Sequence, residues 1–294
     1  MKYYNLIDCE NIQDCKCYLG IMQNCIASII NTTNNNESES EMIEDAKVFI
    51  QFVYIKSLTI KSLLDGFGYE KDDYGNNHPI IDYQSLFSIV RDLYETFCAF
   101  ELIYIYHDSD DKCLLIYNSF VLEGLMDRQR FKSFDNNKSK KSYEQEEIIN
   151  RQNLISKTSF YTTTDDNNRK NLNKLIKQQK LIYIDANNNV NEFFKGSDYV
   201  LFGIKKDVFV DIYKYLSMNT HSSYISIKQY KKVFSSSNTD NHDLACMASN
   251  IAIILMSFFL SDFCKLFPEC KSVLNKLDST YHNLVTFYDK AYRE

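Results

Sequence analysis

The chain of 294 residues contains no tryptophan, only 2 prolines and only 7 glycines. Glycine and proline make the turns of β-sandwiches and barrels, and glycine also makes the phosphate-binding turns of nucleotide folds. Their scarcity disfavours those classes and favours long helices. We therefore predict an all-α protein, a multi-helix bundle, with one small β-hairpin near 181–194.

Several catalytic and nucleotide-binding motifs are also missing from the sequence. It has no G-x-x-x-x-G-K-[ST] phosphate loop, no G-x-G-x-x-G turn, no G-x-S-x-G elbow and no H-E-x-x-H zinc motif. The common nucleotide-binding, hydrolase and zinc-protease classes therefore have no support. We expect no cofactor, no cofactor-binding residue and no metal.

The formal charge is −6, from 33 basic and 39 acidic side chains. This balance argues against a surface devoted to nucleic acid or anionic membrane. The 9 cysteines are odd in number and scattered, and no export signal precedes them. We expect a cytoplasmic protein with reduced thiols in its core.

One apolar segment, Leu244 to Ser261, has no charged residue over 18 positions, which is close to the length that spans a bilayer. Polar residues within it and acidic residues at both ends dilute this signal. We predict a buried core helix and no membrane association.

The pattern along the chain predicts a single helical domain over 1–294, with polar loops near 31–40, 133–142, 162–168 and 235–242. The stretch 66–79 is predicted to be a loop. Helices are expected at 5–30, 40–65, 82–107, 112–131, 143–159, 165–180, 206–221, 243–267 and 269–292.

The helix expected at 82–107 carries an ion pair at the edge of its apolar face. Arg91 and Glu95 are one turn apart, so their side chains can meet. Such a pair either joins helices as a structural contact or orients an anion or a general base. The sequence leaves both roles open.

A second polar group lies on the helix expected at 206–221. Tyr213, Ser217 and His221 follow one another at four-residue steps and share one helical face. A histidine at a helix C-terminus can act as acid, base or helix cap, because the helix dipole favours its charged form. The sequence does not decide whether His221 acts as an acid, a base or a helix cap.

Arg91 and Glu95, with the later Y-x-x-L-S-x-x-x-H pattern from Tyr213 to His221, resemble a broad bacterial family of uncharacterised helical proteins, a domain of unknown function. The similarity covers roughly residues 43–288. It implies that Arg91, Glu95, Ser217 and His221 are the site residues, and it supplies no established reaction.

The sequence is also distantly similar to the HEPN superfamily of helical nucleases, whose site combines an arginine and a histidine separated by four to six residues. The chain departs from that pattern, because Thr96, Phe97 and Cys98 occupy the corresponding positions after Arg91. Lys214 and His221 have the required spacing but replace arginine with lysine.

From these features we expect a binding or regulatory module with an unknown protein partner, which the suspected family links to phage defence or stress response. The alternative is a HEPN-like ribonuclease acting on RNA, with a site built from Arg91, Glu95 and His221. The alternatives differ in geometry, since an enzyme needs the arginine and the histidine to face one water-accessible site.

Overall fold

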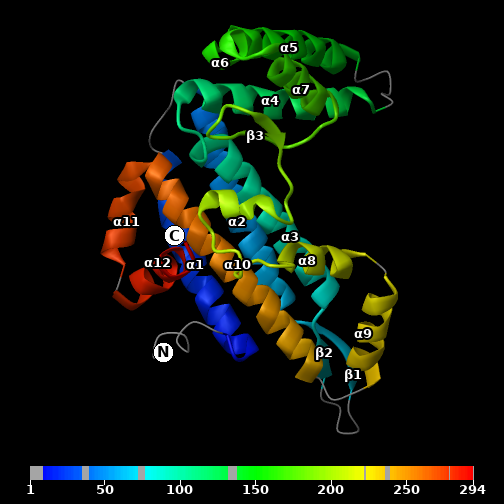
Figure 1. Ribbon diagram of the computed structural model, residues 1–294. Helices are drawn as coiled ribbons and strands as arrows, with labels where there is room; N and C mark the ends of the chain where they lie inside the picture. Colours follow the sequence, from blue (N-terminus) through cyan, green and yellow to red (C-terminus); the bar gives the residue numbers. More distant parts are fainter. Residues whose placement is uncertain are drawn as a thin grey trace. The chain divides into compact units, whose positions relative to one another are not determined.

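The structure is a computed structural model that describes residues 9–34, 40–71, 77–131, 138–221, 223–235, 239–277 and 279–293 (Figure 1). Most of these residues are helical, which confirms the predicted all-α class. The chain divides into two compact units, one formed by Met1–Cys98 with Gly203–Glu294 and the other by Ala99–Phe202. The expectation of one domain over 1–294 stays a prediction.

The first unit is built around one long apolar helix. Its helices are α1 (Ile12–Asn34), α2 (Glu41–Leu63), α3 (Tyr83–Phe100), α8 (Ile212–Thr220), α9 (Tyr224–Ser235), α10 (Thr239–Leu266), α11 (Lys271–Lys276) and α12 (Ser279–Tyr292). Helix α10 packs against α1, α2 and α12, and Figure 1 shows its orange ribbon running beside the blue α1. Its phenylalanines at 258, 259 and 263 are fully buried.

Helix α10 contains the uncharged segment that the sequence predicted to be a core helix. Residues Asn241–Leu266 are long and apolar enough to cross a membrane, yet 72% of the most apolar window is buried inside the protein. Burial of this kind is what the core helix of a soluble protein shows, because its apolar surface is covered by neighbouring helices.

A hairpin follows α2, where the sequence predicted a loop over 66–79. Strand β1 (Phe67–Lys71) pairs antiparallel with β2 (Asn77–Ile80), and Phe67 lies opposite Ile80. Gly66, at φ +67°, makes the turn out of α2 that other residues rarely adopt. The prediction was wrong because the strands are short and Pro79, a poor strand residue, is tolerated in this two-stranded sheet.

The second unit is built around α4 (Asp110–Gln129). Its other elements include the π-helical turn η2 (Glu101–Ile105), α5 (Lys138–Lys157), α6 (Ser159–Thr163), α7 (Asp166–Lys177), β3 (Ile182–Ile184), β4 (Val190–Glu192) and the 3₁₀ turn η4 (Asp198–Phe202). Helix α4 packs against α5, α6 and α7.

The hairpin of β3 and β4 confirms the one expected near 181–194. Asp185 holds the turn between the strands, because its carboxylate accepts hydrogen bonds from the backbone N–H groups of Asn187 and Asn189. Asn188 occupies the left-handed region at φ 63°, which asparagine tolerates.

The ends of several other helices also differ from those predicted from the sequence. The helix expected at 82–107 changes to a π-helical turn after Phe100, and the one expected at 206–221 begins only at Ile212, since Asp211 before it is left-handed at φ 58°. Residues 31–34, 138–142, 235 and 239–242, expected in polar loops, are helical, and the loop expected at 162–168 is reduced to residues 164–165 between α6 and α7. Residues 35–39, 133–137 and 236–238 of the expected loops lie outside the described residues.

The two closing helices separate at Pro268, as predicted, because proline begins the short 3₁₀ turn η5 (Pro268–Cys270). The second of them is divided further into α11 and α12.

Candidate functional site

Helix α8 packs onto α3 through two tyrosines. The ring of Tyr213 lies 5.6 Å from that of Tyr94, and the ring of Tyr215 lies 5.5 Å from that of Phe87 in an edge-to-face contact. Tyr94 and Phe87 are fully buried on the apolar face of α3. Aromatic pairs of this geometry add to the apolar area that they bury, so they fix α8 on the surface of α3.

This packing brings together four polar side chains, here called the α3–α8 cluster: Arg91, Glu95, Tyr213 and Thr220. Arg91 Nε donates to Glu95 Oε1 at 3.0 Å, its Nη2 donates to the Tyr213 hydroxyl at 3.2 Å, and its Nη1 donates to Thr220 Oγ1 at 3.3 Å. The Tyr213 hydroxyl in turn donates to Glu95 Oε1 at 3.2 Å. The guanidinium is thus held on three sides.

The α3–α8 cluster is half-buried. The Arg91 and Glu95 side chains are 27% and 28% exposed. Burial acts to lower the pKa of Arg91, but the hydrogen bond to Tyr213 and the charge of Glu95 outweigh it and raise that pKa. Arg91 therefore remains a cation with a fixed orientation and one side open to water.

The other two predicted site residues have different surroundings. The Ser217 hydroxyl donates to the backbone oxygen of Tyr213 at 2.7 Å, one turn back in the same helix. His221 caps the C-terminus of α8, and its backbone oxygen accepts from the Ser223 N–H and from Ser226 Oγ. The His221 side chain is exposed, and no hydrogen bond from its imidazole to the described residues is found.

Tyr213 and Thr220 were not among the four predicted site residues; Tyr213 was placed on the shared helical face, whereas no role in a site was predicted for Thr220. It stands directly before His221, and its hydroxyl also donates to the Ser217 backbone oxygen at 2.8 Å. A threonine among the polar residues that end a helix looks like a terminator, so its sequence position alone gave no signal for a contact with Arg91.

A second polar contact joins α3 to α9, beside the hairpin of β1 and β2 in sequence. The Asp82 carboxylate accepts from the Tyr230 hydroxyl at 2.6 Å and from Ser85 Oγ at 2.5 Å. Burial acts to raise the pKa of Asp82, but the hydrogen bonds from Ser85 and Tyr230 lower it below its ordinary value. This contact positions α9 after the corner at His221.

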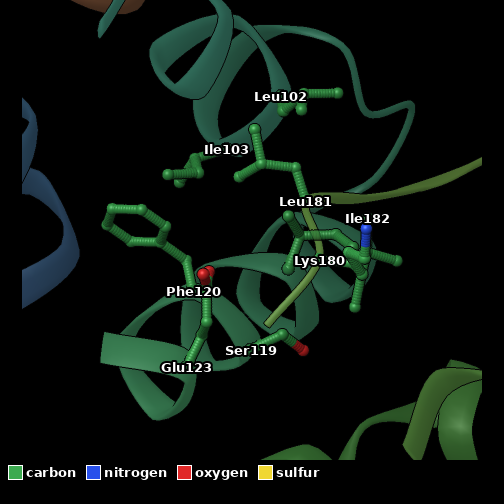
Figure 2. Close-up of a pocket in the computed structure, with 9 residues that line it drawn as sticks. Leu102, Ile103, Ser119, Phe120, Glu123, Lys180, Leu181 and Ile182 are labelled. Atoms are coloured by element: carbon green, nitrogen blue, oxygen red, sulfur yellow. The ribbon is translucent and has the colours of Figure 1, made fainter. Parts of the chain in front are cut away.

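The second unit contains a small apolar pocket between η2, α4 and the start of β3 (Figure 2). Leu102 and Ile103 come from η2, Phe120 and Glu123 from α4, and Leu181 from the segment before β3. Its volume is about 20 Å³, which admits a single water molecule and no organic ligand.

A larger pocket of about 630 Å³ lies in the first unit, between the segment before α1, the segment that leads into α8, and α10. Its walls are mainly apolar, with Phe209, Ile212 and Ile251 among them, while Glu10 and Asp243 bring negative charge. Neither pocket includes a member of the α3–α8 cluster. Among the described residues, no group of three or more His, Cys, Asp or Glu side chains is placed to hold a metal ion.

The fold and the cluster define a mostly helical protein in which a polar group of α3 and α8 is assembled from distant parts of the chain. The model of a family of unknown function (DUF5677) matches residues 82–241, more than half of the chain, and the chain belongs to that family. Neither a curated protein nor a solved structure matches the chain.

The family match confirms the expected membership of a domain of unknown function. The matched residues are fewer than the range 43–288 that the resemblance implied, and they include all four predicted site residues. The similarity to HEPN nucleases stays a prediction.

Proposed function

We propose that the chain is a binding module whose α3–α8 cluster receives an anionic group, of the phosphate class, from its ligand. The observation that carries this proposal is the half-exposed guanidinium of Arg91, fixed by Glu95, Tyr213 and Thr220.

The guanidinium has donors left for a ligand. Of its five N–H groups, three are used by the contacts within the cluster, and no described side chain accepts the remaining two. A planar guanidinium binds phosphate through two parallel hydrogen bonds. Because Arg91 is already oriented, little side-chain entropy is lost when an anion binds.

Glu95 limits how strongly this site attracts anions in general. Its carboxylate lies 3.0 Å from Arg91 Nε and offsets the positive charge of the cluster. Recognition therefore depends on the direction of the free N–H groups more than on net charge, and it favours an anion that presents two oxygens together.

Titration of the purified protein with pyrophosphate, followed by calorimetry, tests the proposal. We expect binding by the wild-type protein, affinity weakened about tenfold or more in Arg91→Gln, and partial retention in Arg91→Lys, because lysine keeps the charge but not the paired donors. Absent binding, or equal affinity in Arg91→Gln, would refute it.

Arg169→Gln provides a matched control. Arg91 lies 5.3 Å from the ring centre of Tyr213, and Arg169 likewise lies 5.6 Å from the ring centre of Tyr161. Arg169 also pairs with a carboxylate one turn away, that of Asp166. It belongs to the second unit, so its replacement should leave pyrophosphate affinity unchanged.

RNA cleavage is the second candidate function, and one contact favours it. Thr220 touches Arg91 and directly precedes His221, whose side chain is exposed. In this proposal Arg91 stabilises the charge on the scissile phosphate, and His221 moves the proton of the attacking or leaving oxygen.

Incubation with labelled single-stranded RNA separates the two candidates. Cleavage that is lost in both His221→Ala and Arg91→Gln would support the nuclease. Equal cleavage in His221→Ala, or none in the wild-type protein, would end this proposal and leave the binding module.

A further inference from the structure

Helix α2 has two apolar faces, and one of them is exposed. Its buried side chains, Phe49, Ile50 and Val53 among them, lie on the face that packs against α1 and α10. The opposite face carries four large apolar side chains that are 38–59% exposed, here called the α2 stripe: Val48, Phe52, Ile55 and Leu58. Exposed apolar side chains that adjoin one another on a surface mark a site of interaction.

The aromatic member of the α2 stripe is held in position before any partner binds. The Lys56 ammonium lies 5.5 Å from the ring centre of Phe52, and the ring of Phe49 lies 6.3 Å from it. Lys56 is itself fixed by Asp92 of α3 at 2.6 Å. Because the ring is already oriented, docking on it costs little side-chain entropy.

The spacing of the α2 stripe matches a second copy of the same helix. Val48, Ile55 and Leu58 follow the a, a and d positions of a heptad repeat, and Phe52 borders this seam. If two α2 helices lie antiparallel, with a two-fold axis beside Val53, Val48 meets the partner's Leu58 and Phe52 meets the partner's Ile55. An apolar side chain thus meets an apolar side chain at every level, as a self-complementary two-fold interface requires.

The charges on this face favour the antiparallel direction. Glu41 and Glu44 are exposed at its start, whereas the exposed residues at its end, Thr59 and Ser62, are uncharged. A parallel pair would bring the carboxylates of both copies together, and Lys47, which pairs with Glu44, offsets only part of that charge. An antiparallel pair places the acidic start of each helix beside the uncharged end of the other.

We propose that the α2 stripe is an interface between two copies of this chain, in which their α2 helices pack antiparallel about a two-fold axis beside Val53. From Val48 to Leu58 the stripe is about 15 Å long. An interface of this size is small, so the dimer is reversible, with a Kd of about 1–100 μM. This proposal is independent of the function proposed for the α3–α8 cluster.

Sedimentation of the full-length protein in the analytical ultracentrifuge, from low to high micromolar concentration, tests the proposal. We expect a dimer whose fraction rises with concentration. Ile55→Lys should weaken it about tenfold or more, because the variant places a charge in the apolar contact of each copy. Ile55 is 59% exposed, so its replacement should leave the fold intact, which circular dichroism checks.

Ile227→Lys provides a matched control. Ile227 lies on α9, outside the α2 stripe, and is 50% exposed, so the same change of side chain there should leave dimerisation unchanged. A dimer that Ile55→Lys does not weaken, or a wild-type chain that stays monomeric, would overturn the proposal. In a monomer, a Phe52→Cys thiol that resists a maleimide would assign the stripe to another segment of the same chain, and a reactive thiol would leave it to a different protein.

Cross-linking tests the direction of the two helices. Val48→Cys and Leu58→Cys are made separately, each with Cys17→Ser to remove an exposed native thiol, and are oxidised mildly alone and as a mixture. Trypsin cleavage after Lys47, Lys56 and Lys61 places the two introduced thiols in peptides 48–56 and 57–61. Mass spectrometry should find a disulfide between these two peptides in the mixture. Two linked copies of one peptide in a single variant would show parallel packing, and either this result or a mixture without the expected link would overturn the proposed interface.

Discussion

In the described part of the first unit, two arginines pair with carboxylates, Arg91 with Glu95 and Arg293 with Asp262 and Asp289, and the two differ in how far water reaches them. In the pair of Arg293 with Asp262, the side chains are 10% and 0% exposed, and two parallel contacts of 2.6 and 2.7 Å join them. In the pair of Arg91 with Glu95, the side chains are 27% and 28% exposed and a single contact of 3.0 Å is present. The ion pair of Arg293 with Asp262 is shielded from water, whereas that of Arg91 with Glu95 is accessible to it.

The surroundings explain the difference. The Arg293 guanidinium lies 4.9 Å from the ring centre of Phe258 on α10, and the backbone of Arg293 forms a bridge with Ile204. This pair fastens the end of α12 to α10. Removing one partner of a buried ion pair lowers folding stability strongly, because the remaining charge stays buried. A solvent-accessible pair contributes little to stability, and its N–H donors remain accessible to a ligand.

The largest effect is expected for Arg293→Met, which leaves the Asp262 carboxylate buried with Lys265 as a remaining partner at 2.7 Å. We expect a loss of about 3–5 kcal/mol in the free energy of unfolding, measured by urea denaturation. The double variant Asp262→Leu with Arg293→Met removes both charges and should recover part of that loss. A loss below about 1 kcal/mol in the single variant would mean that the pair is not shielded from water in solution.

His107, in the second unit, is a largely buried ionisable group. The charge of Asp108 beside it is too weak to offset the effect of burial. Burial lowers the pKa of His107 to about 4, and the backbone of Leu102 and the charge of Asp108 oppose this only in part. Between pH 6.5 and 4 the unfolded chain therefore binds more protons than the folded chain, so stability is complete above pH 6.5 and falls as the pH drops towards 4.

The expected loss across that range is about 3 kcal/mol in the wild-type protein. His107→Gln should lose this part of the pH dependence, which denaturation at several pH values measures. The His221→Gln variant is the control, because that side chain is exposed and its replacement should leave the profile unchanged. Equal profiles in all three proteins would show that His107 is solvated when folded.

Local patterns predicted the parts of the fold and of the site that depend on neighbours in sequence. The four-residue spacing of Arg91 and Glu95 predicted their contact, and the alternation around Asp185 predicted the second hairpin. The hairpin of β1 and β2 was missed because its strands are short and include a proline.

Long-range contacts could not be predicted in this way. Tyr213 lies 122 residues from Arg91 in the sequence, and Thr220 lies 129 residues away. Helical spacing placed Ser217 on the same face as Tyr213, but it could not show that the serine hydroxyl bonds to the backbone of its own helix.

The smallest effect on stability is expected for Arg91→Gln. This variant tests most directly whether the two arginine pairs differ in their contribution to stability. After this change Glu95 keeps its hydrogen bond from Tyr213 and its access to water, so no buried charge is left without a partner. We expect the free energy of unfolding to fall by less than about 1 kcal/mol in urea denaturation. The same variant should bind pyrophosphate about tenfold or more weakly, which separates a role in ligand binding from a role in stability. A loss as large as that of Arg293→Met would place Arg91 with the pairs shielded from water, and its orientation would then serve the packing of α8 on α3 and not a ligand.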